Sequence, residues 1–209
     1  MSNLSTSTAK GPNARTRLLD AARDIIRAQG FASTSLDQLC TTAGVTKGSF
    51  FHHFQSKEAL GVAAANYWSE TTAALFASAP YHDHSEPLDR LLAYIDFRSD
   101  MIDGPIEGFT CLAGTMVQEM FGSSDAIREA CNASISNHAA TLEADILATM
   151  SKHGAPDGIT PQSLALHTQA VLQGGFILAK AKGDPSIARD TVAHLKCYVE
   201  MLFAKGEAQ

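Results

Sequence analysis

The fold is decided by one stretch, residues 16–60, which reads TRLLDAARDIIRAQGFASTSLDQLCTTAGVTKGSFFHHFQSKEAL. From Leu18 onward, apolar residues recur at positions i, i+4, i+7 and i+8, which lie on one face of an α-helix. The spacing therefore predicts a helix over residues 14–29. Gly30 follows as a residue that is free to adopt the left-handed conformation in which many helices end.

Two short helices are predicted next, joined by a glycine-containing turn at residues 43–45. Ser35, with Gln38 three positions later, favours a capping box for a helix over residues 36–42. Thr46 favours the start of the second short helix, over residues 46–53. Two short helices joined in this way are typical of the helix-turn-helix, whose second helix enters the major groove of DNA.

The second short helix presents polar and small residues on its outer side. If Phe50 and Phe54 face the core, then the residues left pointing outward are Thr46, Lys47, Gly48, Ser49, Phe51 and His52. Glycine inside a helix costs about 1 kcal/mol relative to alanine. We therefore interpret Gly48 as allowing close approach to DNA, with relief of internal packing as the alternative.

Composition supports a globular protein with a basic end. The chain has 209 residues, 45% of them apolar, and no apolar run of membrane-spanning length. Its net charge of −6 is uneven: the first 60 residues hold seven Lys and Arg against four acidic residues, and the remainder holds nine against eighteen. This asymmetry predicts a polyanionic partner for the first 60 residues only. The polar N-terminus and four widely spaced cysteines favour a cytoplasmic protein with free thiols.

The rest of the chain predicts further helices and no strands, so the expected fold class is all-α with about nine helices. A disordered tail is expected at residues 1–13, a three-helix helix-turn-helix domain at 14–55, and a helical bundle at 56–209 that is linked to it by a helix over about 56–78. Glycine and proline breaks delimit the later helices at about 85–103, 109–121, 124–153, 162–182 and 185 to the C-terminus.

Residues 16–60 resemble the DNA-binding domain of TetR/AcrR-type transcriptional repressors, most specifically at AGVTKGSFFHHFQSKEAL, residues 43–60. The resemblance implies a homodimer that binds a palindromic double-stranded DNA operator and is released by a small-molecule effector. The DNA contacts that it implies are Arg17, Thr34, Ser35, Thr46, Lys47, Gly48, Ser49, Phe51, His52 and Lys57. Phe51 departs from the family, which usually has tyrosine here, so a hydroxyl contact to phosphate is lost; Cys40 stands where alanine is common.

The resemblance also implies a ligand-binding and dimerisation bundle. Apolar stripes on the last two helices predict a dimer interface at Val171, Gly174, Leu178, Leu195, Tyr198 and Leu202, unless those stripes face the subunit's own core. The predicted ligand-binding residues are Trp68, Phe97, Met101, Phe109, Cys111, Met116, Met120, His167 and Phe176. Because such residues are also usual in protein cores, core packing is the alternative for each.

Two other functions stay open. Cys111 lies at the start of a predicted helix, where a thiol is more nucleophilic, so an electrophile- or redox-sensing repressor is one alternative. Its segment resembles a Gly-Cys-Leu stretch of electrophile-sensing repressors in the family, although Phe109 and Thr110 separate Gly108 from the cysteine here. The other alternative is a small-molecule binding protein without DNA function. No enzyme motif, cofactor site or metal site is predicted, because the one metal candidate, at residues 82–84, lacks a third ligand.

Overall fold

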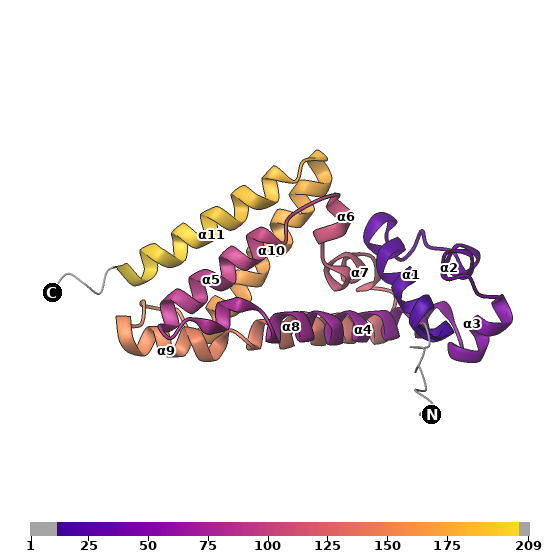
Figure 1. Cartoon of the computed structure of the whole chain (residues 1–209), viewed down its shortest axis with the longest axis horizontal. Coiled ribbons are helices and arrows are strands. Elements are labelled where there is room, and N and C mark those ends of the chain that lie inside the picture. The colour runs from indigo at the N-terminus through magenta and orange to yellow at the C-terminus, as the bar shows by residue number, and fades with distance from the viewer. Residues whose placement is uncertain (1–11, 205–209) are drawn as a thin grey trace, which may run out of the picture.

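The computed structural model describes residues 12–204, which contain helices and no strands, as predicted. Three helices, α1 (Ala14–Gln29), α2 (Leu36–Ala43) and α3 (Lys47–His53), form a head at one end of an elongated molecule (Figure 1). The body contains α4 (Lys57–Ala77), the 3-10 helix η1 (Pro80–Asp83), α5 (Pro87–Asp100), α6 (Ile106–Phe109), α7 (Leu112–Met120), α8 (Asp125–Ala140), α9 (Glu143–His153), α10 (Pro161–Lys182) and α11 (Ser186–Ala204). Residues 1–11 of the predicted disordered tail lie outside the described residues.

The helices of the head begin and end where local sequence signals predict. The side chains of Asn13, Ser35 and Thr46 each accept a hydrogen bond from the backbone N–H three residues later, at 2.9–3.1 Å. These contacts satisfy amides that the first turn of a helix leaves without partners. Gly44 has φ 61° and ψ 42°, the left-handed conformation that ends α2. The helix-turn-helix geometry therefore follows from local chemistry.

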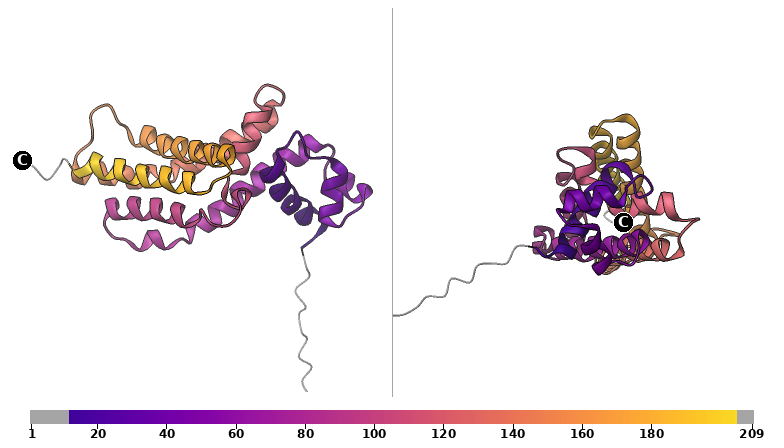
Figure 2. Two further views of the ribbon diagram at one scale, coloured as in Figure 1. Left: turned by 90° about the horizontal axis from the view of Figure 1, so that it is seen from above. Right: turned by 90° about the vertical axis from the view of Figure 1, so that its right-hand side faces the viewer.

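Helix α4 connects the head to the body and runs beside α8 along the length of the molecule (Figures 1 and 2). The apolar core of the head continues into the body, because Leu18 and Phe50 belong to the same buried cluster as Leu112, Met116 and Ile127 of α7 and α8. A second buried cluster fills the far part of the body between α5, α9, α10 and α11. The head and the near part of the body therefore share one apolar core.

For two helices of the body, the predicted bounds are wrong. The single helix expected over 124–153 is two helices, α8 and α9, because the chain turns at Thr141, whose hydroxyl donates to the His138 carbonyl at 2.7 Å, and buries Leu142. The helix expected from Phe109 begins only at Leu112, and Phe109 ends the separate turn α6. The described residues thus form eleven α-helices rather than about nine. None of them is long and apolar enough to cross a membrane.

Candidate nucleic-acid interface and ligand pocket

Helix α3 packs against the core of the head on one side and is exposed to solvent on the other. Phe50 is fully buried and packs against Phe54, with ring centroids 5.7 Å apart. On the opposite side, Phe51 is 56% exposed, and His52 is also exposed. The outward-facing surface of this segment, here called the reading ridge, is formed by Thr46, Lys47, Gly48, Ser49, Phe51 and His52 and excludes the buried Phe50.

Gly48 has no packing role within the chain. A Cβ built at this position meets only the Thr46 hydroxyl oxygen, at 3.7 Å, which is ordinary van der Waals contact. Its φ is not positive, so the backbone does not require glycine either. The alternative that Gly48 relieves internal packing is therefore wrong for the described part of the chain, where no contact or backbone conformation requires a glycine at this position.

Three of the predicted DNA-contacting residues are basic, and each is held by a contact within the chain. Lys47 forms an exposed ion pair with Asp37, 2.6 Å between Nζ and Oδ1. Arg17 donates from Nε to the carbonyl of Ala43 at 3.0 Å, which ties α1 to the end of α2. Lys57 donates to a backbone carbonyl at 3.2 Å, and its partial burial lowers its pKa. Contact with DNA would require Lys47 to leave its partner, whereas Arg17 retains free guanidinium N–H groups for a phosphate.

The structure contradicts the predicted contact between the Thr34 side chain and DNA. This side chain is 2% exposed, and its hydroxyl donates to the Gly30 carbonyl at 2.6 Å. The side chain therefore closes the turn between α1 and α2 and is not available to a phosphate group. Its neighbour Ser35 is exposed, although its hydroxyl oxygen caps α2.

A pocket of about 380 Å³, here called the central pocket, lies where the head joins the body. Residues of α1, α4, α5, α6, α8 and α10 line it, together with Cys111. Five of the nine predicted ligand-binding residues are among them: Trp68, Met101, Phe109, Cys111 and Phe176. Its volume is within the range of small-molecule sites.

The other four predicted ligand-binding residues lie outside this lining. Met116 is fully buried in the core that joins the head to α7, so it packs against protein atoms on all sides. Met120 is half-buried against the same core. Phe97 packs against the rings of Phe76 and Tyr81, and His167 is exposed on α10 beside Tyr198, with ring centroids 5.2 Å apart.

Sequence reasoning missed the polar lining of the central pocket. Arg27, Arg98, His138 and Gln169 all contribute to it. The Tyr94 hydroxyl lies 2.9 Å from His138 Nε2, and burial lowers the pKa of His138 to about 4, so the ring is neutral at pH 7. The sequence carried no signal for Arg27, because at 100° per residue it lies off the apolar stripe of α1 that contains Leu18, Ala22, Ile25 and Ile26.

Arg27 connects the head to the body. Its guanidinium donates from Nε to the Thr110 carbonyl at 2.7 Å and from Nη2 to the Gly108 carbonyl, and it lies 4.9 Å from the centre of the Trp68 ring. Lys180 of α10 in turn donates to the Arg27 carbonyl at 3.0 Å. These contacts join α1, α4, α10 and the segment before α7 at one residue.

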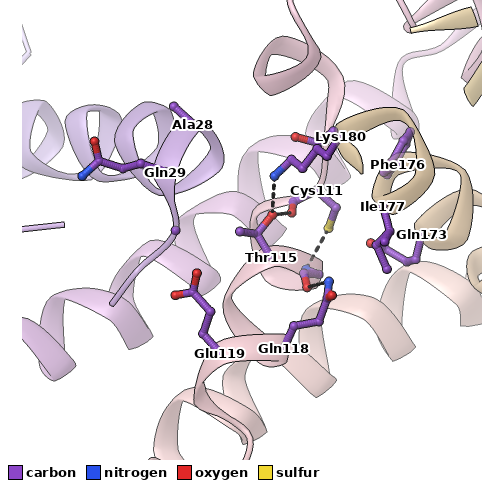
Figure 3. Close-up of a pocket in the computed structure, with 13 residues that line it drawn as sticks. Ala28, Gln29, Cys111, Thr115, Gln118, Glu119, Gln173, Phe176, Ile177 and Lys180 are labelled. Atoms are coloured by element: carbon purple, nitrogen blue, oxygen red, sulfur yellow. Dashed lines mark hydrogen bonds between the residues drawn. The ribbon is translucent and has the colours of Figure 1, made fainter. Parts of the chain in front are cut away.

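Cys111 lies between the central pocket and a second hollow, here called the junction pocket, which is lined by α1, α7 and α10 (Figure 3). Its Sγ accepts a hydrogen bond from the backbone N–H of Gly114 at 3.3 Å, so it caps α7 as predicted for a helix start. Lys180 enters the same hollow and donates to the Thr115 hydroxyl at 3.1 Å. Cys111 is half-buried and belongs to the lining of both pockets.

Helices α10 and α11 form an antiparallel pair on one flank of the body (Figure 2). Leu178 is 51% exposed on this flank, and a Cβ built at Gly174 would meet no atom within 4 Å. The prediction that Leu195 lies in the dimer interface is wrong, because this residue is 3% exposed and packs inside its own subunit. Val171, Tyr198 and Leu202 are half-buried at the edge of that core and keep part of their surface free.

Comparison with known proteins agrees with this arrangement. Residues 18–64 match the family model of bacterial regulatory proteins, tetR family, and residues 87–195 match the tetracyclin repressor-like C-terminal domain. The transcriptional regulator UidR of Escherichia coli strain K12 is 48% identical over 46 residues, which are 22% of this chain and 24% of UidR. The chain therefore spans only about a quarter of the length of that relative. The E. coli transcriptional repressor NemR is 33% identical over 123 residues, 56% of this chain and 58% of NemR.

Solved structures extend the similarity to nearly the whole molecule. The crystal structure of E. coli NemR in its reduced form superposes with a TM-score of 0.74 and 26% identity, covering 88% of this chain and 96% of that one. A TetR-family regulator from Agrobacterium tumefaciens superposes with a TM-score of 0.78 and 21% identity, covering 91% and 97%, and shows the shared fold. With both family models matched in order along the chain, this protein belongs to the tetR family of bacterial helix-turn-helix transcriptional regulators.

Proposed function

We propose that this protein is a dimeric repressor that binds a palindromic DNA operator through its two reading ridges and leaves it when a small molecule fills the central pocket. The observation that carries the proposal is the reading ridge itself. Its side chains are exposed apart from the half-buried Ser49, and Gly48 keeps a bare backbone where the subunit has room for a side chain. A surface free of Cβ atoms at the start of a helix suits close approach to the major groove.

The charge distribution supports DNA as the partner of the head. The first 60 residues carry more basic than acidic residues, whereas the body is strongly acidic. Phosphate contacts position a protein on DNA, and side chains on base edges specify the sequence. We assign positioning to Arg17 and Lys57, and base reading to Lys47, Ser49 and His52. Phe51, which lacks a hydroxyl, offers an apolar contact of the kind that suits a thymine methyl group.

A dimer follows from the limited reach of one ridge. A single short helix reads only a few base pairs, so specific binding requires two heads on one duplex, about 34–36 Å apart or a multiple of that spacing. The exposed apolar side chains on the α10–α11 flank, Leu166, Ile177, Leu178 and Met201, support this flank as the self-association surface. An isologous contact between two such flanks is the commonest oligomer symmetry.

Release by an effector is supported by the position of the central pocket. Its walls include Trp68 and Thr72 of α4 and Arg27 of α1, and both helices hold the head. A ligand that favours a different arrangement of these helices changes the separation of the two reading ridges. For ordinary allosteric coupling it must bind the DNA-incompetent state better by about 1–3 kcal/mol.

A second candidate function, release of DNA through modification of Cys111, is favoured by the access of this thiol to two pockets. In that reaction the Cys111 sulfur forms a bond to the β-carbon of a quinone or enal, the acceptor's C=C π bond breaks, and the thiol proton passes to the adduct. Treatment with such an electrophile, followed by DNA-release and intact-mass measurements on Cys111→Ser, distinguishes the two routes. Equal release from the Ser variant excludes the covalent one.

The experiment that tests the proposed function is selection of bound genomic fragments by the purified protein, followed by gel-shift titration of the fragments with Lys47→Ala. We expect specific fragments to be enriched and the variant to bind them at least about tenfold more weakly while remaining folded and dimeric. Enrichment no greater than that of random DNA would leave only a small-molecule binding protein.

A further inference from the structure

We propose that the central pocket binds an organic anion with a flat, aromatic or similarly apolar body, and that the guanidinium of Arg98 holds its acid group. The inference rests on the proposed function, because it names the chemical class of the effector. It follows from the charge and geometry of the pocket lining, which carries three arginines, Arg23, Arg27 and Arg98, against one carboxylate, Asp24.

The one carboxylate of the lining already has a partner. Asp24 pairs with Arg23, 2.7 Å between Oδ1 and Nε, in a two-point contact on α1. Arg98 and Arg27 are left, and no carboxylate in residues 12–204 comes within 4.0 Å of a nitrogen of either one. Two cations on one half-closed cavity without a bound anion are unfavourable, and an anionic ligand would compensate them.

Arg98 has the more available donors. Within residues 12–204 its guanidinium has one polar contact, Nη1 to His138 Nε2 at 3.4 Å, and that nitrogen already lies 2.9 Å from the Tyr94 hydroxyl. It is held instead between two aromatic rings, 5.2 Å from the centre of Phe76 and 5.9 Å from that of Phe176. Cation–π contacts of this kind occupy no N–H group of the guanidinium, so its N–H donors remain for a carboxylate, which a guanidinium can bind at two points.

Arg27 adds a second positive charge at the other wall. Its side chain is 8% exposed, its burial lowers its pKa, and its partners are two neutral carbonyl groups. Arg27 therefore adds positive charge to the pocket lining without a carboxylate that neutralises it.

The remaining walls suit a flat apolar body. The rings of Phe109 and Phe176 lie 5.9 Å apart, and Trp68 closes the wall below Arg27. Gln169 is buried, its Nε2 donates to the Tyr94 hydroxyl at 3.3 Å, and its side-chain carbonyl oxygen can accept a hydrogen bond from a polar substituent. A cation lacks a carboxylate partner here, and a neutral molecule leaves both guanidinium groups uncompensated, so the lining discriminates in favour of an anion.

The test uses three probes of equal shape and different charge: 4-tert-butylbenzoate, the neutral 4-tert-butylbenzamide and the cationic 4-tert-butylbenzylamine. Trp68 is the only tryptophan of the chain and lines the pocket, so its fluorescence reports binding without DNA. We expect the benzoate to bind at least about tenfold more tightly than the amide, and the amine more weakly than both. Arg98→Met should abolish the preference for the benzoate, whereas Arg98→Lys, which keeps a positive charge, should retain part of it.

Arg128→Met is the matched control for loss of one positive charge, because Arg128 is exposed on α8 and pairs with Asp125 on its own helix. Thermal unfolding of each variant verifies the fold. Equal affinity for benzoate and benzamide, no saturable benzoate binding up to about 10 mM, or an unchanged preference in a folded Arg98→Met protein would overturn the inference. A benzoate preference without DNA release would support the inference and count against the proposed release mechanism.

Discussion

Replacing Gly48 with alanine should stabilise the protein and weaken its binding to DNA. The added Cβ meets only the Thr46 hydroxyl oxygen at 3.7 Å, so the native structure accepts it without strain. Alanine restricts the unfolded chain and favours a helix over glycine by about 0.5–1 kcal/mol. On DNA the same methyl group occupies space that the groove edge needs, so we expect affinity to fall at least about tenfold, or ~1.4 kcal/mol.

The two effects are measured separately, by equilibrium chemical unfolding without DNA and by fluorescence anisotropy with a selected operator fragment. Gly122→Ala is the matched control, since a Cβ there meets no atom within 4 Å and the φ of Gly122, like that of Gly48, is not positive. The control should leave operator affinity unchanged. A Gly48→Ala protein that binds the operator as tightly as the parent, or that is less stable, would refute the role assigned to this glycine.

Three further predictions follow from described contacts. Asp37→Asn should strengthen operator binding about two- to tenfold by releasing Lys47 from its 2.6 Å ion pair, with stability changed by less than about 0.5 kcal/mol; weaker binding in a gel shift would contradict this. Leu178→Glu should convert the dimer to folded monomers in sedimentation and abolish specific DNA binding, and a persistent dimer would place the interface elsewhere. Because burial lowers the pKa of His138 from 6.5 to about 4, its neutral form stabilises the fold fully above pH 6.5, and this contribution is lost as the pH falls toward 4. The loss, on the order of 3 kcal/mol, should be absent in His138→Gln when unfolding is followed against pH.

The head could be predicted from sequence because its signals are local. The caps at Ser35 and Thr46 and the left-handed Gly44 are decided by residues within four positions of each other. The break between α8 and α9 has no such signal: Thr141 and Leu142 are neither glycine nor proline, and only the packing of Leu142 into the core fixes the turn. Side-chain periodicity continues across it, so sequence alone predicts one helix.

The central pocket was predicted only in its apolar part. Trp68 and Phe176 could be expected from their chemistry, but the polar groups depend on contacts between distant segments. Arg27 meets the Thr110 carbonyl 83 residues away, and Tyr94 meets His138 at a separation of 44. The periodicity of one helix does not show which polar residue of another helix faces it. The same limit explains why the prediction for Leu195 was wrong, since periodicity does not show that this residue of α11 faces the core of its own subunit.

The central claim is that two copies of the reading ridge enter the major groove of one duplex. Guanine-N7 methylation interference on a selected operator tests it most directly, since N7 lies on the major-groove edge of the base. We predict two symmetry-related patches of interference, separated by about one helical turn of 10–10.5 base pairs or a multiple of it, and both absent with Lys47→Ala at the same concentration. One unpaired patch, or binding that N7 methylation does not affect, would contradict the account.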